Sequence, residues 1–162
     1  MPFTPFHFGP GAAFHAAAPK QVSFLAFCAA NVLIDVEPLY FMVTGQFPLH
    51  RFFHTYVGAP IILLLTCALF VGALRLASVV SLPNLFGWKQ LKIRPVVIGA
   101  ALGSYSHIVL DSFMHSDIRP FAPLSEANPL LGAMSLSALH WSCLAAGVAG
   151  FVVVGIRRAA RQ

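Results

Sequence analysis

Charged residues are scarce in this chain of 162 residues: Asp, Glu, Lys and Arg make up 9% of it, whereas 58% of the residues are hydrophobic. A water-soluble domain carries about 25% charged residues, so this chain lacks the polar side chains needed to cover its surface in water. The composition therefore excludes an ordinary soluble domain and predicts an integral membrane protein with a few transmembrane helices. There are only three cysteines, all inside apolar segments, and this argues against a disulfide framework.

Acidic residues are rarer still: five stand against ten Lys and Arg, giving a net charge of +5. The basic residues are scattered in short connections between apolar runs, which is not the pattern of a nucleic-acid-binding protein. Internal repeats, low-complexity tracts and long linkers are also lacking, so we expect one integral membrane domain over 1–162. The N-terminus has neither a basic region nor a clean apolar stretch of a cleavable signal, and we expect it to stay in the mature protein.

What is present is a series of long apolar runs, which predicts an all-α fold, a polytopic membrane helical bundle. We expect four transmembrane helices over 21–41, 57–80, 95–114 and 133–156, preceded by a short helix over 9–18. That short helix would reach only roughly 16 Å, about half of a hydrocarbon core, so we expect it at half depth. Folding the chain back about Lys20 would bring His7 and Asp35 to a similar depth.

Basic residues are distributed unequally between the two sides of this predicted bundle. One side collects Lys20, Arg75, Lys89, Lys92, Arg94, Arg157, Arg158 and Arg161, and the other has only Arg51 and Arg119. By the positive-inside rule the first side is expected to be cytoplasmic. All five acidic residues and most histidines fall on the opposite, extracytoplasmic side.

An unusual polar cluster is predicted on that side, beginning with His107 and Asp111. These residues are four apart in an otherwise apolar helix, where ionisable groups are costly and usually functional. Imidazole and carboxylate are ligands for zinc and similar divalent ions. The candidate metal ligands are His7, Asp35, Glu37, His50, His54, His107 and Asp111. This number is enough for two ions, and pairs of divalent ions are typical of phosphate-ester hydrolysis.

Other polar residues are open to simpler interpretations. Arg51 and Arg119 are interpreted as ligands for phosphate oxygens, with contact to lipid headgroups as the alternative. His115 and His140 at helix ends are typical of interfacial polar groups, and His15 has no evident partner. Asp117 and Glu126 lie in a loop and are expected in water, while Cys143 is expected to be a small core residue.

The order of these motifs resembles the YdjM-like family, bacterial inner-membrane proteins described as metal-dependent hydrolases and distantly similar to zinc-dependent phospholipase C and P1 nuclease. The resemblance covers roughly residues 3–123. The matching positions are His7 in TPFHFGPG, Asp35 and Glu37 in LIDVEP, His50, Arg51 and His54 in HRFFHT, His107, Asp111 and Ser112 in SHIVLDS, and the loop DIRPFAP. Two departures are one residue fewer between His50 and His54, and Glu37 where aspartate is usual. The resemblance implies a phosphoesterase-like activity and a location in the bacterial inner membrane.

These observations together predict a multi-pass hydrolase in which metal-activated water attacks a phosphate-containing, lipid-linked substrate at the extracytoplasmic face. Asp35, Glu37 and Asp111 are expected to take part in catalysis as ligands or general base, and Arg51 and Arg119 by holding phosphate. Membrane lipids are the expected partners. Two alternatives stay open: a divalent-metal or proton transporter, and a non-catalytic membrane protein with a structural His/Asp site.

Overall fold

The computed structural model describes residues 5–160, which form helices and connecting loops without a strand. In chain order the helices are η1 (Pro5–His7), α1 (Phe8–Ala17), α2 (Phe24–Ile34), α3 (Val36–Val43), η2 (Phe52–His54), α4 (Ala59–Val79), η3 (Leu85–Gln90), α5 (Ile93–Met114) and α6 (Leu136–Ala159). Four helical segments are long and apolar enough to cross a membrane: Phe24–Val43, Ala59–Val79, Ile93–Met114 and Leu136–Ala159. The predicted all-helical class, with four long apolar helices and a short N-terminal one, is confirmed. Phe3, Thr4 and Arg161, which entered the sequence predictions, lie outside the described residues.

Helix α5 packs mainly against α2 and α4. Small residues allow α2 to approach it closely: a Cβ atom at Gly103 would lie 2.6 Å from the carbonyl oxygen of Phe27. Fully buried Ala30, Ile62 and Ile108, from α2, α4 and α5, belong to the shared apolar core. This packing fixes the three helices that carry or flank the polar cluster.

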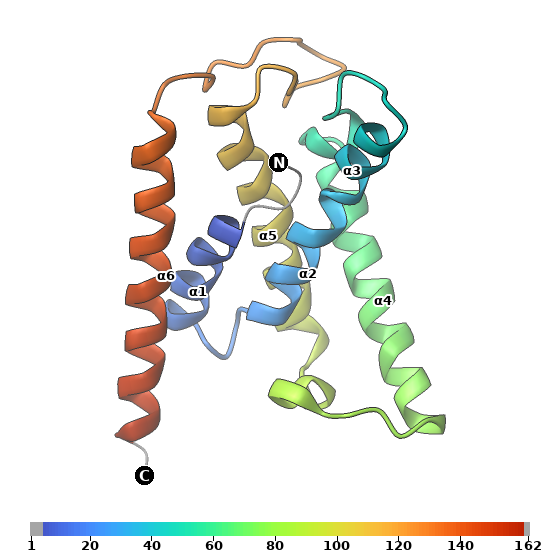
Figure 1. Cartoon of the computed structure of the whole chain (residues 1–162). Helices are drawn as coiled ribbons and strands as arrows, with labels where there is room; N and C mark the ends of the chain where they lie inside the picture. The colour runs from blue at the N-terminus through green and yellow to red at the C-terminus, as the bar shows by residue number, and fades with distance from the viewer. Residues whose placement is uncertain (1–4, 161–162) are drawn as a thin grey trace.

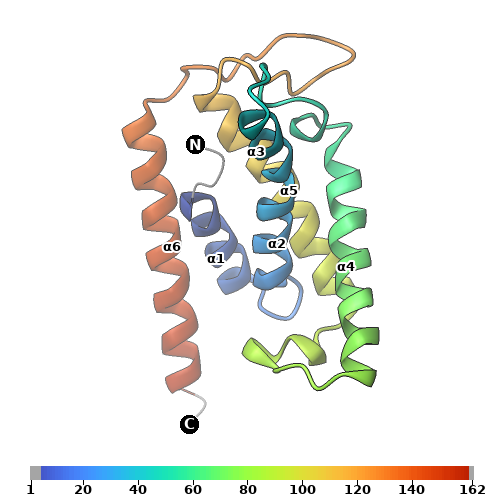
Figure 2. The same ribbon diagram turned by 45° about the vertical axis from the view of Figure 1, so that its right-hand side comes forward.

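Helix α1 packs mainly against α6, and the two run side by side in both views (Figures 1 and 2). The contact again depends on small residues, because a Cβ atom at Gly150 would lie 2.5 Å from the backbone carbon of Ala12. With 10 residues, α1 spans about 15 Å and cannot cross a bilayer by itself. Its start places His7 inside the bundle, where the side chain is buried.

The first predicted span is interrupted at Asp35, between α2 and α3. Pro38 explains the interruption, because it has no N–H to donate to the carbonyl of Ile34 and its ring crowds that carbonyl. The backbone of Asp35 keeps helical angles, φ −72° and ψ −10°, so α3 continues toward the same end of the molecule. The break sets a carboxylate at a helix junction within the bundle.

The two ends of the bundle differ in chemistry. One end carries the connections between α3 and α4 and between α5 and α6, and the other carries the α1–α2 turn and η3 (Figure 1). We call the first the loop end and the second the basal end. All five acidic residues belong to the loop-end half, whereas every charged residue described at the basal end is Lys or Arg.

Candidate metal centre

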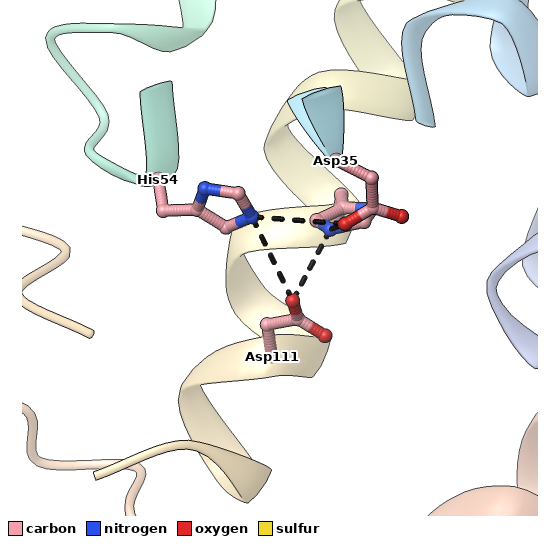
Figure 3. Close-up of side chains that lie close together, drawn as sticks. Asp35, His54 and Asp111 are labelled. Atoms are coloured by element: carbon pink, nitrogen blue, oxygen red, sulfur yellow. Dashed lines mark ion pairs between the residues drawn. The ribbon is translucent and has the colours of Figure 1, made fainter. Parts of the chain in front are cut away.

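Four buried side chains converge in the loop-end half of the bundle: Asp35, His54, His107 and Asp111. Their donor atoms all lie within 4.8 Å of one another. Figure 3 shows Asp35, His54 and Asp111 directed toward a common point from three different elements. These four groups could hold a metal ion.

Each side chain reaches this point for a local reason. His107 and Asp111 are one turn apart on α5, so helical geometry puts them on the same face. Asp35 enters from the α2–α3 junction, and His54 is the last residue of η2, just before α4. The loop holding η2 is fixed to the opposite connection, because the backbone N–H of Tyr56 donates to the carbonyl of Pro120 at 2.8 Å.

The spacing of the donor atoms fits a small divalent ion. His107 Nε2 lies 3.2 Å from both Asp35 Oδ1 and Asp111 Oδ2. His54 Nε2 lies 4.0 Å and 3.8 Å from the same two oxygens. Ligands about 2.0–2.1 Å from a tetrahedral zinc ion are roughly 3.3 Å apart, so the observed spacing is near to that needed.

Two of these atoms, His54 Nε2 and His107 Nε2, are buried and form no well-directed hydrogen bond, although carboxylate oxygens lie near them. Leaving a buried polar atom unpaired costs roughly 1–3 kcal/mol, so groups of such atoms are rarely present without a purpose. Their convergence on one point is the arrangement expected of ligand atoms. The four side chains therefore fit a metal ion by the kind of ligand atoms, by their spacing and by the lack of well-directed hydrogen bonds to the two imidazole Nε2 atoms.

The far nitrogen of each imidazole is held by another side chain. His107 Nδ1 lies 3.0 Å from Asn31 Oδ1, and the Asn31 amide itself donates to the carbonyl of Phe27 at 2.9 Å. His54 Nδ1 lies 3.4 Å from Glu37 Oε2. A partner of this kind fixes the ring and its tautomer, leaving Nε2 free to bind a metal.

Glu37, which we predicted as a metal ligand, therefore contacts the outer nitrogen of His54 and is not one of the four converging side chains. Its carboxylate also accepts hydrogen bonds from the backbone N–H groups of Arg51, at 3.0 Å, and Phe53, at 3.1 Å. This arrangement ties the loop that carries His54 to α3.

A second group of possible ligands consists of His50, Asp111 and His115. His50 Nε2 lies 4.0 Å from Asp111 Oδ2, and the His50 and His115 rings are 4.4 Å apart. Asp111 belongs to both groups. Its other oxygen, Oδ1, lies 3.1 Å from Nε2 of His7, whose ring contacts that of His107.

Asp117 orients His50 from the following loop. Its Oδ1 lies 2.9 Å from His50 Nδ1, while its Oδ2 accepts the backbone N–H groups of Leu49 and His50. Burial of His50 and the neighbouring His54 hold the pKa of its imidazole below the usual value, despite Asp117. Burial acts to raise the pKa of Asp117, but hydrogen bonds from His50 outweigh it and leave that pKa below the usual range. The lowered pKa of His50 favours the neutral imidazole, which is the form that binds metals.

The two arginines lie outside the donor groups, at a cavity of about 640 Å³ that His50 and Asp117 also line. The guanidinium of Arg51 lies 3.6 Å from the centre of the Phe41 ring and its Nε donates to the carbonyl of Pro48. Arg119 is about half exposed, and its Nε is 3.8 Å from Glu126. One candidate ligand, His50, and the two arginines therefore line the same cavity.

Of the predicted ligands, the structure brings together His7, Asp35, His50, His54, His107 and Asp111, with Glu37 in contact with His54. Sequence reasoning missed Asn31 and undervalued His115 and Asp117. Asn31 could have been found from the sequence, since it is an amide in an apolar run one turn before Asp35.

His15 and His140 lie apart from the cluster: His15 Nδ1 lies 2.7 Å from the Val22 carbonyl, and His140 stacks on Phe6. Cys143 is buried, as expected of a core residue.

No protein family, curated protein or solved structure matches the chain. The resemblance to the YdjM-like family therefore stays a prediction, and functional inference rests on the geometry of the site.

Proposed function

We propose that this protein is a membrane-embedded, metal-dependent hydrolase of phosphate esters. The observation that carries the proposal is the position of Asp111, whose carboxylate faces two groups of candidate ligands at once. A shared carboxylate between neighbouring divalent ions is suited to two-metal hydrolysis of phosphate esters.

The two groups differ in the number of donors that they offer. Asp35, His54, His107 and Asp111 make four, the number that closes a tetrahedral site. His50, Asp111 and His115 make three, which is the number in catalytic zinc sites that keep one position open. His50 also lines the cavity, so the open position would be reached from there.

A divalent ion bound by these residues supplies a water nucleophile at neutral pH and polarises a phosphoryl oxygen. Arg51 and Arg119 line the same cavity and offer planar guanidinium groups, which bind phosphate oxygens through paired hydrogen bonds. Asp117, Glu37 and Asn31 hold three histidines in position. The chain therefore offers groups for binding, orientation and hydrolysis within one region.

The lining of the cavity favours an amphiphilic substrate. Phe47 and Phe52 line it together with the arginines, and both rings are substantially exposed. A lipid-linked phosphate ester matches this combination of apolar and cationic surface, and it can enter from the bilayer. By the positive-inside rule the cavity faces the extracytoplasmic side.

Transport requires a polar path to the opposite end of the bundle. Among residues 5–160, the buried polar side chains between the cluster and the basal end are Ser23, Thr66 and Ser104, and their hydroxyls bond to the backbone. His15 is the one histidine or acidic residue in the described basal half, and its Nδ1 contacts a carbonyl. The described residues therefore favour hydrolysis over proton or metal transport.

The proposal is tested by measuring the metal content of detergent-purified protein by mass spectrometry. We expect about two divalent ions per wild-type chain, and loss of metal in Asp111→Ala and His107→Ala. His140→Ala is the matched control, because His140 stacks on Phe6 away from the cluster. Wild type and control are expected to hydrolyse a chromogenic phosphodiester after zinc is added, and the two cluster variants are not. Folded wild-type protein without metal, or Asp111→Ala with unchanged metal and activity, would contradict the proposal.

A further inference from the structure

The basal end contains a second cavity, of about 630 Å³, which the metal centre does not use. It lies among the α1–α2 turn, η3, the start of α5 and the last turns of α6, and we call it the basal groove. Its volume is within the range of about 300–1,000 Å³ that is typical of ligand sites.

Three cations line the basal groove: Lys20 from the α1–α2 turn, Lys92 before α5, and Arg158 near the end of α6. They come from elements far apart in sequence, and all three are exposed. No acidic residue lines the groove, since all five belong to the loop-end half. Within residues 5–160 none of these three cations forms an ion pair, so their charge is available to an anion.

The inner wall of the groove is apolar. Phe24 and Phe151 meet edge to face with ring centres 5.8 Å apart, and Val154 lies one turn further along α6. The wall is held together at two points: Arg157 donates a hydrogen bond to the carbonyl of Ala16, and His15 Nδ1 donates one to the carbonyl of Val22. The groove is therefore a defined surface between fixed elements.

The short length of α1 creates this space. Gly150 lies against Ala12, and from that point α1 continues for five residues but α6 for nine. Helix α6 therefore extends roughly 6 Å further, at 1.5 Å per residue, and carries Arg158 beyond the end of α1. In a membrane-crossing bundle this level corresponds to the layer of lipid headgroups.

We propose that the basal groove binds one anionic phospholipid. Lys20, Lys92 and Arg158 hold its phosphate, and an acyl chain lies against Phe24, Phe151 and Val154. Basic pockets between transmembrane helices on the cytoplasmic side are suited to anionic headgroups, and the three cations with an apolar wall match both parts of such a lipid. The proposal is independent of the metal centre, which lies in the other half of the bundle.

Native mass spectrometry of the full chain tests it by titrating purified protein with phosphatidylglycerol and with phosphatidylcholine of the same acyl chains. Wild type is expected to bind one phosphatidylglycerol in preference to phosphatidylcholine. The triple variant Lys20→Gln, Lys92→Gln, Arg158→Gln is expected to bind phosphatidylglycerol roughly 100-fold more weakly, about fivefold for each cation removed. The matched control is Arg75→Gln, Lys89→Gln, Arg94→Gln, which removes the same charge from the same end but from residues outside the groove.

A second variant, Val154→Trp, keeps every charge and fills the apolar wall, and it is also expected to weaken phosphatidylglycerol binding. An unchanged thermal unfolding transition in detergent reports that each variant is folded. Equal losses in the two triple variants would overturn the proposal, because they would indicate attraction to the basic end as a whole. Absence of a preference for phosphatidylglycerol in wild type would overturn it too. So would displacement of the lipid by inorganic phosphate alone, which would indicate a simple anion site.

Discussion

Asn31 is the residue that best distinguishes a metal site from a cluster of polar side chains without a ligand. Its Oδ1 lies 3.0 Å from His107 Nδ1, and its amide nitrogen is fixed by the carbonyls of Phe27 and Gly103. The amide therefore has one orientation, in which its oxygen accepts the Nδ1 proton of His107. Such a contact directs Nε2 toward Asp35 and Asp111.

Replacing Asn31 by Leu is expected to weaken zinc binding by roughly 10- to 100-fold while leaving every proposed ligand in place. The reason is that His107 loses the partner that sets its tautomer. Competition with a chromogenic zinc chelator measures the change. Asn84→Leu is the control, since Asn84 lies at the basal end and bonds to Gln90. Equal zinc affinity in wild type and Asn31→Leu would mean that His107 is not oriented for a metal.

The residues of the site were predictable to different degrees, for physical reasons. His107 and Asp111 could be predicted because ionisable groups in an apolar helix are costly and their spacing puts them on one face. The position of His115 could be predicted in the same way, because it follows Asp111 by another four residues, although we interpreted it as an interfacial group. Asp117 could not be predicted, because its place depends on how two loops meet at the end of the bundle. Sequence position gives the side of the membrane, but it does not give the contact between His50 and Asp117.

At the level of elements, α1 has an unusual role. It is too short to span the bilayer, and its start places His7, the residue directly before it, inside the bundle. It is held there by close packing on α6 at Gly150, where a Cβ atom would lie 2.5 Å from the backbone of Ala12. Overpacking of this kind costs about 1–3 kcal/mol or displaces the helix.

Gly150→Ala is therefore expected to lower the thermal stability of the protein and to reduce its affinity for zinc, because α1 and His7 move together. Gly155→Ala is the matched control: it lies in the same helix, and a Cβ atom there would meet nothing within 4 Å. Differential scanning fluorimetry in detergent and zinc titration measure the two effects. Similar behaviour of both variants would show that close packing at Gly150 does not hold α1 in place.

The helices themselves were largely predictable, because long apolar runs require helical structure wherever a membrane surrounds them. The interruption at Asp35 was not predicted, although Pro38 in the sequence carried the signal. A proline in an apolar helix can produce a kink, a break or neither, so the sequence alone did not give the outcome. The α1–α6 contact was also beyond prediction, since alanine and glycine show no strong pattern until a partner helix is known.

On the scale of the whole molecule, charge divides the protein into two different ends. The acidic residues, the candidate metal centre and the two arginines lie toward the loop end, and the other described Lys and Arg residues lie toward the basal end. By the positive-inside rule we expect the basal groove on the cytoplasmic side and the cavity beside the candidate metal centre on the extracytoplasmic side. This orientation decides which leaflet supplies the lipid-linked substrate of the candidate metal centre and which supplies the phospholipid of the basal groove.

Cysteine labelling in intact cells measures the orientation directly. Ser125→Cys lies in the exposed loop between α5 and α6, and Ser81→Cys is exposed beyond the end of α4. A membrane-impermeant maleimide is expected to label Ser125→Cys from outside, and Ser81→Cys only after the membrane is permeabilised. Wild type is the control, because Cys28, Cys67 and Cys143 lie within α2, α4 and α6 and are expected to stay unlabelled. The reverse pattern would put the metal centre in the cytoplasm and the basal groove outside, and a lipid-linked substrate would then have to be sought in the inner leaflet.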